Sequence, residues 1–366
     1  MKMNEKIRNM TIGLFCAATV SILLTGCGSG EATKQSAAAD DSLDTIIEKA
    51  KEEGEIASLG MPDTWANWVG TWNDLEKEYG LSHVDTDMSS AEELAKFESE
   101  GKNGTADIGD VGISFGPLAE SKELTLPYKT NYWEEIPDWA KDDDGDWLLS
   151  YTGTISFITD KENVKQAPTS WKELQEGDYQ VSVGDVTIAN QAQFAVLAAA
   201  IANGGDEKDI QPGLNYYKKM AEKGRLSTVD ASVANLEKGE IDVAVVRDFN
   251  GLNYRDQIDS ERFEVTVPTD GSIISGYTTL INKNAPHPNA AKLAREYILS
   301  DEGQINLAKG YARPIRKVEL PKEVAEKLLP EDAYEAAVPV EDNEAWNKTS
   351  VELPELWQAE VLTYAK

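Results

Sequence analysis

The chain has 366 residues, of which 41% are hydrophobic, which is enough material for two domains with sizeable cores. It carries 65 acidic and 35 basic residues, a formal net charge of -30. That charge disfavours binding to nucleic acid or to anionic lipid surfaces and favours cationic partners. Only two histidines, His83 and His287, and two cysteines, Cys16 and Cys27, are present. A histidine-rich zinc site is therefore excluded. Both cysteines lie within the first 27 residues, so the chain beyond residue 27 can form neither a disulfide nor a thiolate site.

Residues 1–26 have the organisation of an export signal. A positively charged start precedes an apolar stretch at 10–24, about fifteen residues long and too short to span a membrane as a mature helix. The run LTGC that ends at Cys27 resembles the lipobox of bacterial lipoproteins, which implies cleavage before Cys27 and lipid attachment there. A plain secretory signal or a short signal anchor is the alternative. We expect a protein held by lipid on the extracytoplasmic face of the membrane, in the periplasm or at the cell surface.

From residue 42 onward, helical and strand patterns alternate. Residues 27–41 are small and polar without apolar periodicity, so we expect a flexible tether there. The patterns then predict strands at 55–60, 81–88 and 107–113, each followed by a helix, at 64–79, 89–100 and 114–121. Such alternation favours an α/β fold with a largely parallel sheet.

The stretch 147–159 (WLLSYTGTISFIT) is a long β-type run with Gly153 in its middle, as a crossover between two lobes would have. After it the alternation restarts, with predicted strands at 180–186, 242–246, 263–267 and 273–281 and helices at 191–203, 214–222, 229–238, 288–299 and 301–309. We therefore predict a two-lobed α/β fold with a hinge and a cleft. The predicted parts are 42–152 plus 272–316 for lobe 1, 153–271 for lobe 2, and 317–366 as C-terminal helices whose lobe stays open.

Candidate ligand residues follow from a rule of open α/β sheets, in which ligands bind beyond the carboxyl ends of the strands. In the predicted first lobe these positions are Asp63, Thr64, Trp65, Ser114 and Phe115. Asp63 and Trp65 would supply a charge and a stacking wall, or else a helix cap and a core ring. Ser114 and Phe115 begin a helix, where free N–H groups suit an anion.

The second lobe and the crossover supply the remaining candidates. They are Thr154, Asp185, Thr187, Arg247, Asp248, Asn250 and Tyr277, with Gly153 and Gly276 as hinge positions. Asp248 is the preferred second-lobe charge, and Arg247 could pair with it or bind an anion itself.

Three segments in order resemble a known family. They are DIGDVGISF at 107–115, the stretch from SGYTTLINKNAPHPNAAKL to SDEGQ at 275–304, and GYARPIR at 310–316. Together, over residues 42–316, they resemble the extracellular solute-binding proteins of ABC importers with the type II periplasmic-binding-protein fold, in the branch for iron(III), polyamine, thiamine or sugar-phosphate uptake. The resemblance implies a monomer that closes on a small solute and delivers it to a permease and its ATPase, without chemistry, cofactor or resident metal.

The candidate residues do not decide which class of solute is bound. Asp63, Asp185 and Asp248 with Trp65 and Tyr277 would form an acidic, aromatic pocket for an organic cation such as a polyamine or a thiamine-like molecule. Ser114, Thr154 and Thr187 with Arg247 could instead hold a phosphorylated or phosphonate anion. Iron(III) is a third possibility, but the adjacent Tyr216 and Tyr217 sit in a helical pattern, away from the family's ligand position.

Two other functions compete with transport. A ligand-sensing or adhesive surface lipoprotein could use the same fold. A surface hydrolase is disfavoured because only two histidines are present to serve as a catalytic base.

Overall fold

The computed structural model describes residues 42–365. The predicted signal peptide, the tether and Cys27 lie outside these residues. Within residues 42–365, none of the helices has both the length and the apolar character needed to cross a membrane.

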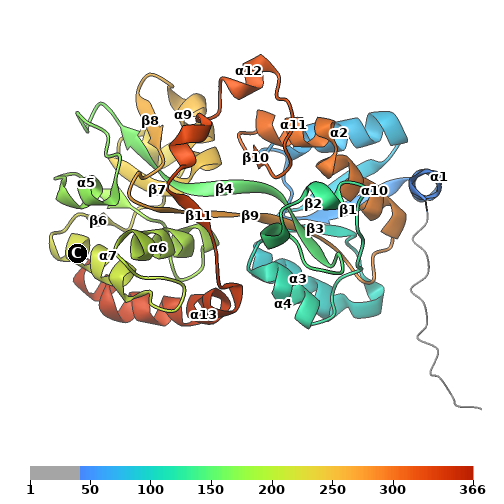
Figure 1. The fold of residues 1–366 in the computed structure, drawn as a ribbon, viewed down its shortest axis with the longest axis horizontal. Coiled ribbons are helices and arrows are strands. Elements are labelled where there is room, and N and C mark those ends of the chain that lie inside the picture. The colour runs from blue at the N-terminus through green and yellow to red at the C-terminus, as the bar shows by residue number, and fades with distance from the viewer. Residues whose placement is uncertain (1–41, 366) are drawn as a thin grey trace, which may run out of the picture. The chain divides into compact units, whose positions relative to one another are not determined.

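A single mixed sheet runs through two lobes (Figure 1), with the strand order β2-β1-β3-β9-β4-β7-β5-β6. We call the part around β1 to β3 the first lobe and the part around β5 to β8 the second lobe. Parallel pairing prevails inside each lobe, whereas β4 and β9 pair antiparallel and join the lobes. The predicted α/β class and two-lobed architecture are confirmed. The strands are β1 (Glu55–Leu59), β2 (Ser82–Thr86), β3 (Ile108–Gly112), β4 (Trp147–Asp160), β5 (Val181–Ser182), β6 (Leu226–Ser227), β7 (Val243–Arg247), β8 (Phe263–Thr266), β9 (Ser272–Ile281), β10 (Arg313–Pro314) and β11 (Ala337–Pro339).

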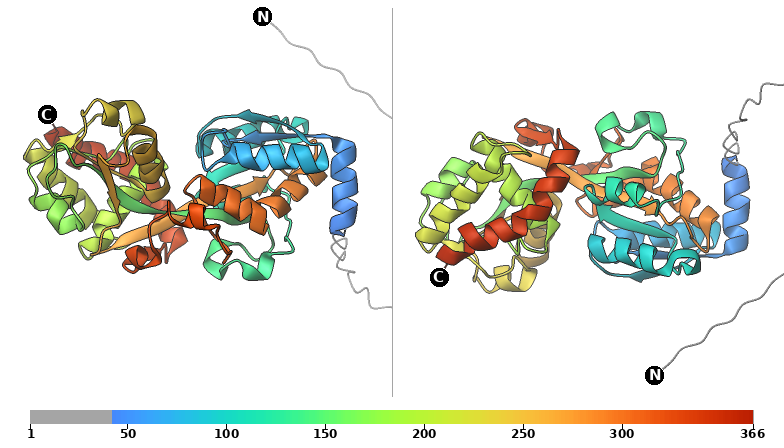
Figure 2. Two further views of the ribbon diagram at one scale, coloured as in Figure 1. Left: turned by 90° about the horizontal axis from the view of Figure 1, so that it is seen from above. Right: turned by 90° about the horizontal axis from the view of Figure 1, so that it is seen from below.

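Helices surround the sheet of each lobe (Figures 1 and 2). The helices of the first lobe are α1 (Leu43–Glu53), α2 (Trp68–Tyr79), α3 (Ser90–Glu100), α4 (Phe115–Ser121), α10 (Pro288–Leu299) and α11 (Asp301–Lys309). Those of the second lobe are α5 (Trp171–Glu176), α6 (Asn190–Ala202), α7 (Gln211–Glu222), α8 (Val233–Glu237) and α9 (Asp248–Ile258). Short 3-10 turns lie at Gly101–Asn103, Trp133–Glu135, Asp138–Ala140, Glu331–Tyr334 and Leu362–Tyr364. Helix α6 is apolar around most of its circumference because it is buried in the core of the second lobe.

The C-terminal segment returns from the first lobe to the second. After β10, helix α12 (Lys322–Ala325) contacts α11, and β11 then pairs with β9. Helix α13 (Asn343–Glu360) packs on the second lobe, where Trp346 contacts Phe194 and Trp357 contacts Tyr217. The sequence did not decide to which lobe residues 317–366 belong, and the structure assigns α13 to the second lobe.

The predicted helix at 64–79 begins four residues later, at Trp68. Ala66 and Asn67 have φ angles of 47° and 56°, in the left-handed region, so the helix cannot extend back through them. Tertiary contacts hold this turn, because the Asn67 side chain donates to the Asn306 carbonyl and Gly310 packs against Ala66. Trp65 consequently lies in a loop after β1, and Asp63 does not cap a helix.

Two further boundaries differ from the prediction. The strand expected at 180–186 ends at Ser182, because Asp185 accepts hydrogen bonds from the main chain and hydroxyl of Thr187 and turns the chain. The helix expected at 229–238 begins only at Val233, where the Ser232 side chain caps it. The predicted start of α3 is confirmed, since Ser89 and Glu92 form a capping box.

The two predicted hinge glycines lie in neighbouring registers of the crossover, with Gly153 opposite Ser275 and Gly276 opposite Thr152. A Cβ atom on Gly276 would lie 2.2 Å from the Tyr151 carbonyl oxygen, and one on Gly153 would lie 2.6 Å from the Phe249 ring. Close approach therefore requires glycine at both positions. Their role as a hinge stays a prediction.

Candidate functional site

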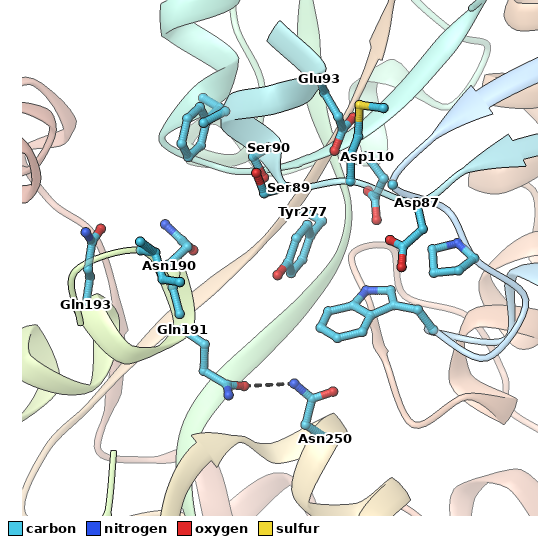
Figure 3. A pocket seen from close by; sticks show the side chains of 18 of the residues that line it. Asp87, Ser89, Ser90, Glu93, Asp110, Asn190, Gln191, Gln193, Asn250 and Tyr277 are labelled. Carbon is cyan, nitrogen blue, oxygen red and sulfur yellow. Dashed lines mark hydrogen bonds between the residues drawn. The ribbon is translucent and has the colours of Figure 1, made fainter. Parts of the chain in front are cut away.

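A cavity of about 560 Å³ is lined by residues of both lobes (Figure 3). Its walls are formed by the loops and helix starts that follow the carboxyl ends of β1, β2, β3, β5, β6 and β7, as the rule for open sheets predicts. The lining includes Thr64, Trp65, Asp87, Glu93, Asp110 and Phe115 of the first lobe, Asn190, Gln191, Asp230, Asn250 and Tyr254 of the second lobe, and Tyr277 of β9.

Five of the predicted ligand residues line this cavity. They are Thr64, Trp65, Phe115, Asn250 and Tyr277. These residues come from four segments that are far apart in the sequence, and the fold brings them together around one cavity.

Four of the predicted residues lie at the surface or in the turns around the cavity and are not part of its lining. Asp63 is exposed and faces a separate shallow depression that includes His83. Ser114 precedes α4 without making a side-chain cap. Asp185 is exposed and, with Thr187, stabilises its own turn. We therefore correct the interpretation of Asp63 and Asp185 as pocket charges.

Asp248 is buried behind the cavity and also requires correction. Its carboxylate accepts from the main-chain N–H of Thr154 at 2.8 Å and from the hydroxyl of Tyr334 at 2.5 Å. Burial raises the pKa of Asp248, while the two hydrogen bonds act in the opposite direction. Asp248 and Thr154 thus connect α9, β4 and the C-terminal segment instead of lining the cavity.

Arg247 is fully buried, and its guanidinium is engaged by neighbouring side chains. Nε donates to Ser275 Oγ at 3.1 Å, Nη1 to the Tyr277 hydroxyl at 3.2 Å, and Nη2 to Asn190 Oδ1 at 2.6 Å. The guanidinium also lies 5.0 Å from the Tyr277 ring centre. Arg247 therefore orients two lining residues from behind and is not itself part of the wall.

Trp65 is held in the cavity by aromatic contacts from both sides. Its ring meets Phe249 and Tyr277 edge to face, with centroid distances of 5.2 and 5.5 Å. Its indole N–H donates to the Tyr151 hydroxyl at 2.7 Å, and that hydroxyl donates to Asp110 Oδ2, also at 2.7 Å. The chain of two hydrogen bonds fixes the indole relative to a buried carboxyl group.

Four acidic residues line the cavity, namely Asp87, Glu93, Asp110 and Asp230, and none was predicted from the sequence. Glu93 and Asp110 are 1% and 2% exposed. Burial raises the pKa of both carboxyl groups well above the usual range, and the charge of Asp110 raises that of Glu93 further. The described lining contains no lysine or arginine.

These acids were missed because each has an ordinary local context. Glu93 is one of several glutamates in α3 and reads as part of a solvated helix face, although it lies on the buried face beside Leu94 and Phe97. Asp110 is the acid that the sequence could have singled out. A charged residue inside a strand that is buried throughout is rare and needs an explanation.

Amide side chains dominate the wall contributed by the second lobe. Gln191 Oε1 accepts from Asn250 Nδ2 at 2.8 Å and from the Arg247 main-chain N–H at 2.9 Å (Figure 3). Asn190 begins α6 and faces Gly112 of β3 in the other lobe. A Cβ atom added to Gly112 would lie 3.1 Å from Asn190 Oδ1. The cavity thus combines carboxyl, aromatic and amide groups, which suit a polar organic molecule with positive charge.

No metal centre is indicated at this cavity. Among residues 42–365, the cluster of acidic side chains close enough to share an ion is Glu120, Asp142 and Asp146, which do not line the cavity.

Residues 103–349 match the family model described as bacterial extracellular solute-binding protein. The thiosulfate-binding protein of Escherichia coli is 24% identical over 152 residues, 40% of this chain and 45% of that protein, so the match spans less than half of that relative. The structure of the periplasmic binding protein AfuA from Actinobacillus pleuropneumoniae, with exogenous fructose-6-phosphate bound, has a TM-score of 0.69 at 18% identity and covers 84% of this chain and 98% of that one. A periplasmic thiamin binding protein has a TM-score of 0.68 at 16% identity, covering 84% and 96%.

These likenesses at low identity show a shared type II periplasmic-binding-protein fold, and the family match extends over more than half of the chain. Binding of a solute, not catalysis, is what the family description states. The chain belongs to the bacterial extracellular solute-binding proteins.

Proposed function

We propose that this protein is the lipid-anchored solute-binding component of an ABC importer and that its solute is an organic cation. The solute enters the cavity between the lobes, the lobes close on it, and the loaded protein delivers it to a permease driven by an ATPase. Cys27 carries the lipid and keeps the protein on the extracytoplasmic face of the membrane.

The charge of the cavity wall carries the proposal for the solute. Asp87, Glu93, Asp110 and Asp230 contribute carboxyl groups, and the described lining offers no basic side chain to an anion. One unit charge placed about 4 Å from a carboxylate interacts with it by roughly 4 kcal/mol at an effective dielectric constant of about 20. An anionic solute would meet a repulsion of similar size.

The aromatic side chains support the same class of solute. Trp65, Phe115, Tyr254 and Tyr277 line the cavity. Their ring faces attract ammonium and heteroaromatic cations, by about 2 kcal/mol per contact when water is excluded. Thiamin, named in one of the similar structures, is such a cation.

The alternatives have less support in the cavity. A phosphate or phosphonate would find no free basic side chain, because the Arg247 guanidinium is buried and already donates to three side chains. For iron(III), the paired tyrosines are core residues of α7, with Tyr216 donating to the Trp171 carbonyl and Tyr217 to the Ala195 carbonyl.

A thermal-shift panel tests the class of solute. Residues from Ser42 onward form one compact unit, so a soluble form beginning at residue 28 is suitable. The panel contains spermidine, putrescine and thiamine, then glucose 6-phosphate, aminoethylphosphonate and thiosulfate, then ferric citrate. A solute at 100 times its dissociation constant adds about 2.7 kcal/mol to the stability and raises the melting temperature. A rise with cations alone supports the proposal, whereas a rise only with the anions or with ferric citrate contradicts it.

Uptake measurements separate transport from sensing or adhesion. Deleting the gene is expected to abolish accumulation of the radiolabelled solute, and replacing Cys27 by Ser should release the protein from the membrane fraction. Uptake that continues unchanged without the protein would favour the sensing or adhesive alternative.

A further inference from the structure

Two of the cavity acids, Glu93 of α3 and Asp110 of β3, form a buried pair (Figure 3). Glycines make room for the Glu93 carboxyl group. A Cβ atom on Gly60 would lie 2.4 Å from Glu93 Oε1, and one on Gly109 would lie 2.6 Å from Oε2. The main chain of Asp110 lies beside the Glu93 carboxyl group and partly offsets the rise of its pKa. The loop after β1 and strand β3 therefore have glycine where a larger residue would collide with the Glu93 carboxyl group of α3.

Each carboxyl group of the pair has one buried oxygen without a hydrogen-bond partner, Oε2 in Glu93 and Oδ1 in Asp110. Other buried carboxylates of the same protein are fully engaged. Asp160 receives two hydrogen bonds from Arg262, and Asp107 receives bonds from the main chain of Ala57 and from His287. A buried carboxylate without such partners is unfavourable, so the pair needs a proton or an external cation.

The surrounding groups favour a proton in the empty protein. Asp85 and Asp87, on and after β2, add negative charge, which opposes ionisation of Glu93. On the other side, the Tyr151 hydroxyl, the Trp68 indole and the more distant Arg247 favour the ionised form of Asp110. Burial outweighs these contacts and raises the pKa of both carboxyl groups, since two adjacent acids in a site of low dielectric cannot readily both ionise.

We propose that Glu93 and Asp110 together are the proton-exchanging counter-charge for the solute: the pair holds one proton in the empty protein and releases it to the solvent when a cationic group binds beside it. This inference rests on the proposed function, because it requires a cationic solute. No covalent bond changes other than the loss of one O–H proton to the buffer, and one cationic group of the solute takes the place of that proton beside the pair.

A consequence is that affinity depends on pH. Binding that releases one proton strengthens by up to about tenfold per pH unit while the empty pair remains protonated. The dependence disappears above the pH at which the empty pair has lost that proton. Lowering the pH through the range in which the empty pair takes up its proton therefore weakens capture of the cation without any change in the cation itself.

Calorimetry with spermidine as the probe measures the proton directly. The binding enthalpy is measured at pH 7 in phosphate and in Tris, whose ionisation enthalpies differ, with thiamine as a second probe. We expect release of about one proton by the wild-type protein, because a single solute charge replaces it. Glu93→Gln should release none and should bind at least tenfold more weakly, and Asp110→Asn provides a second variant should Glu93→Gln fold poorly.

Asp230→Asn is the matched control, since it removes an exposed acid of the same cavity from the opposite lobe. It should weaken spermidine binding and keep the proton release. An infrared band of a protonated carboxylic acid should be present in the empty wild-type protein at neutral pH, decrease on addition of spermidine, and be absent in Glu93→Gln.

The outcomes separate the two proposals. Spermidine or thiamine binding with equal enthalpy in both buffers and no acid band overturns the proton exchange and leaves the cation function intact. Loss of proton release in Asp230→Asn overturns its assignment to the pair. Binding of thiosulfate or glucose 6-phosphate with no binding of any cation overturns both proposals.

Discussion

The two lobes contribute different chemistry to the same cavity. The wall from the first lobe carries three of the four acids and the indole of Trp65, whereas the wall from the second lobe presents amides and a single exposed acid, Asp230. Charge attraction acts over several ångströms, but hydrogen bonds to amides require contact. For the proposed cationic solute, we therefore expect the first lobe to capture it and the second lobe to complete its recognition.

Neutralising an acid of the first lobe should have the largest effect on binding. In Asp110→Asn the buried counter-charge and the acceptor for Tyr151 are both weakened. We expect a loss of about 2 to 3 kcal/mol, or roughly 30- to 150-fold in affinity for the cation, measured by calorimetry. An affinity within threefold of the wild type would mean that the charge of the first lobe does not recognise the solute.

Removing the aromatic wall of the first lobe should have the next largest effect. Trp65→Ala removes the ring that contacts Phe249 and Tyr277, and we expect about tenfold weaker binding from the lost cation–π contact. Trp65→Phe keeps a ring face and should retain most of the affinity. Wild-type tryptophan emission should change on binding, and a spectrum indifferent to saturating solute would argue that Trp65 does not contact it.

An amide of the second lobe should matter less. Asn250→Ala removes a neutral hydrogen-bonding group whose partner is Gln191, and the expected loss is about 1 kcal/mol, or roughly fivefold in affinity. The effect should fall mainly on the dissociation rate, because the amide engages a solute that is already captured. A loss larger than that of Asp110→Asn would reverse the comparison between the lobes.

The smallest expected effect is on the stability of the empty protein. In the unfolded chain Glu93 and Asp110 titrate near pH 4, whereas burial raises both pKa values in the folded protein. Between these values the folded state binds more protons than the unfolded state, so the free energy of unfolding falls as pH rises. Glu93→Gln should flatten this dependence, as measured by urea denaturation at pH 6 and pH 8. A wild-type stability that rises over this interval, with the variant following the same curve, would show that the pair is ionised when empty.

Much of the fold could be predicted from the sequence, because alternation of strand and helix periods reports burial along the chain. Pro288 at the start of α10 and the capping box of Ser89 and Glu92 mark their helices by local chemistry alone. The late start of α2 could not be predicted, since Ala66 and Asn67 are held in left-handed conformations by contacts with Asn306 and Gly310, far away in the sequence.

The candidate site was predicted in part for the same reason. The rule that ligands lie beyond strand ends identified Trp65 and Asn250, and Tyr277 was chosen for its place near the hinge; all three line the cavity. The rule ranks positions along the chain but does not tell which side chain turns inward. Asp248 was therefore chosen for its charge, although Thr154 and Tyr334 engage that charge behind the wall.

By itself, the sequence determined the two-lobed α/β class, most of the strands along the chain and the resemblance to the family, because periodicity, turn residues and motif order are properties of neighbouring positions. Only the tertiary structure decided which carboxyl groups face the cavity. Glu93 and Asp110 belong to a helix and a strand whose local patterns resemble those of any solvated helix or buried strand. Their pairing depends on the packing of α3 against β3 and on the space left by Gly60 and Gly109, which no local pattern records.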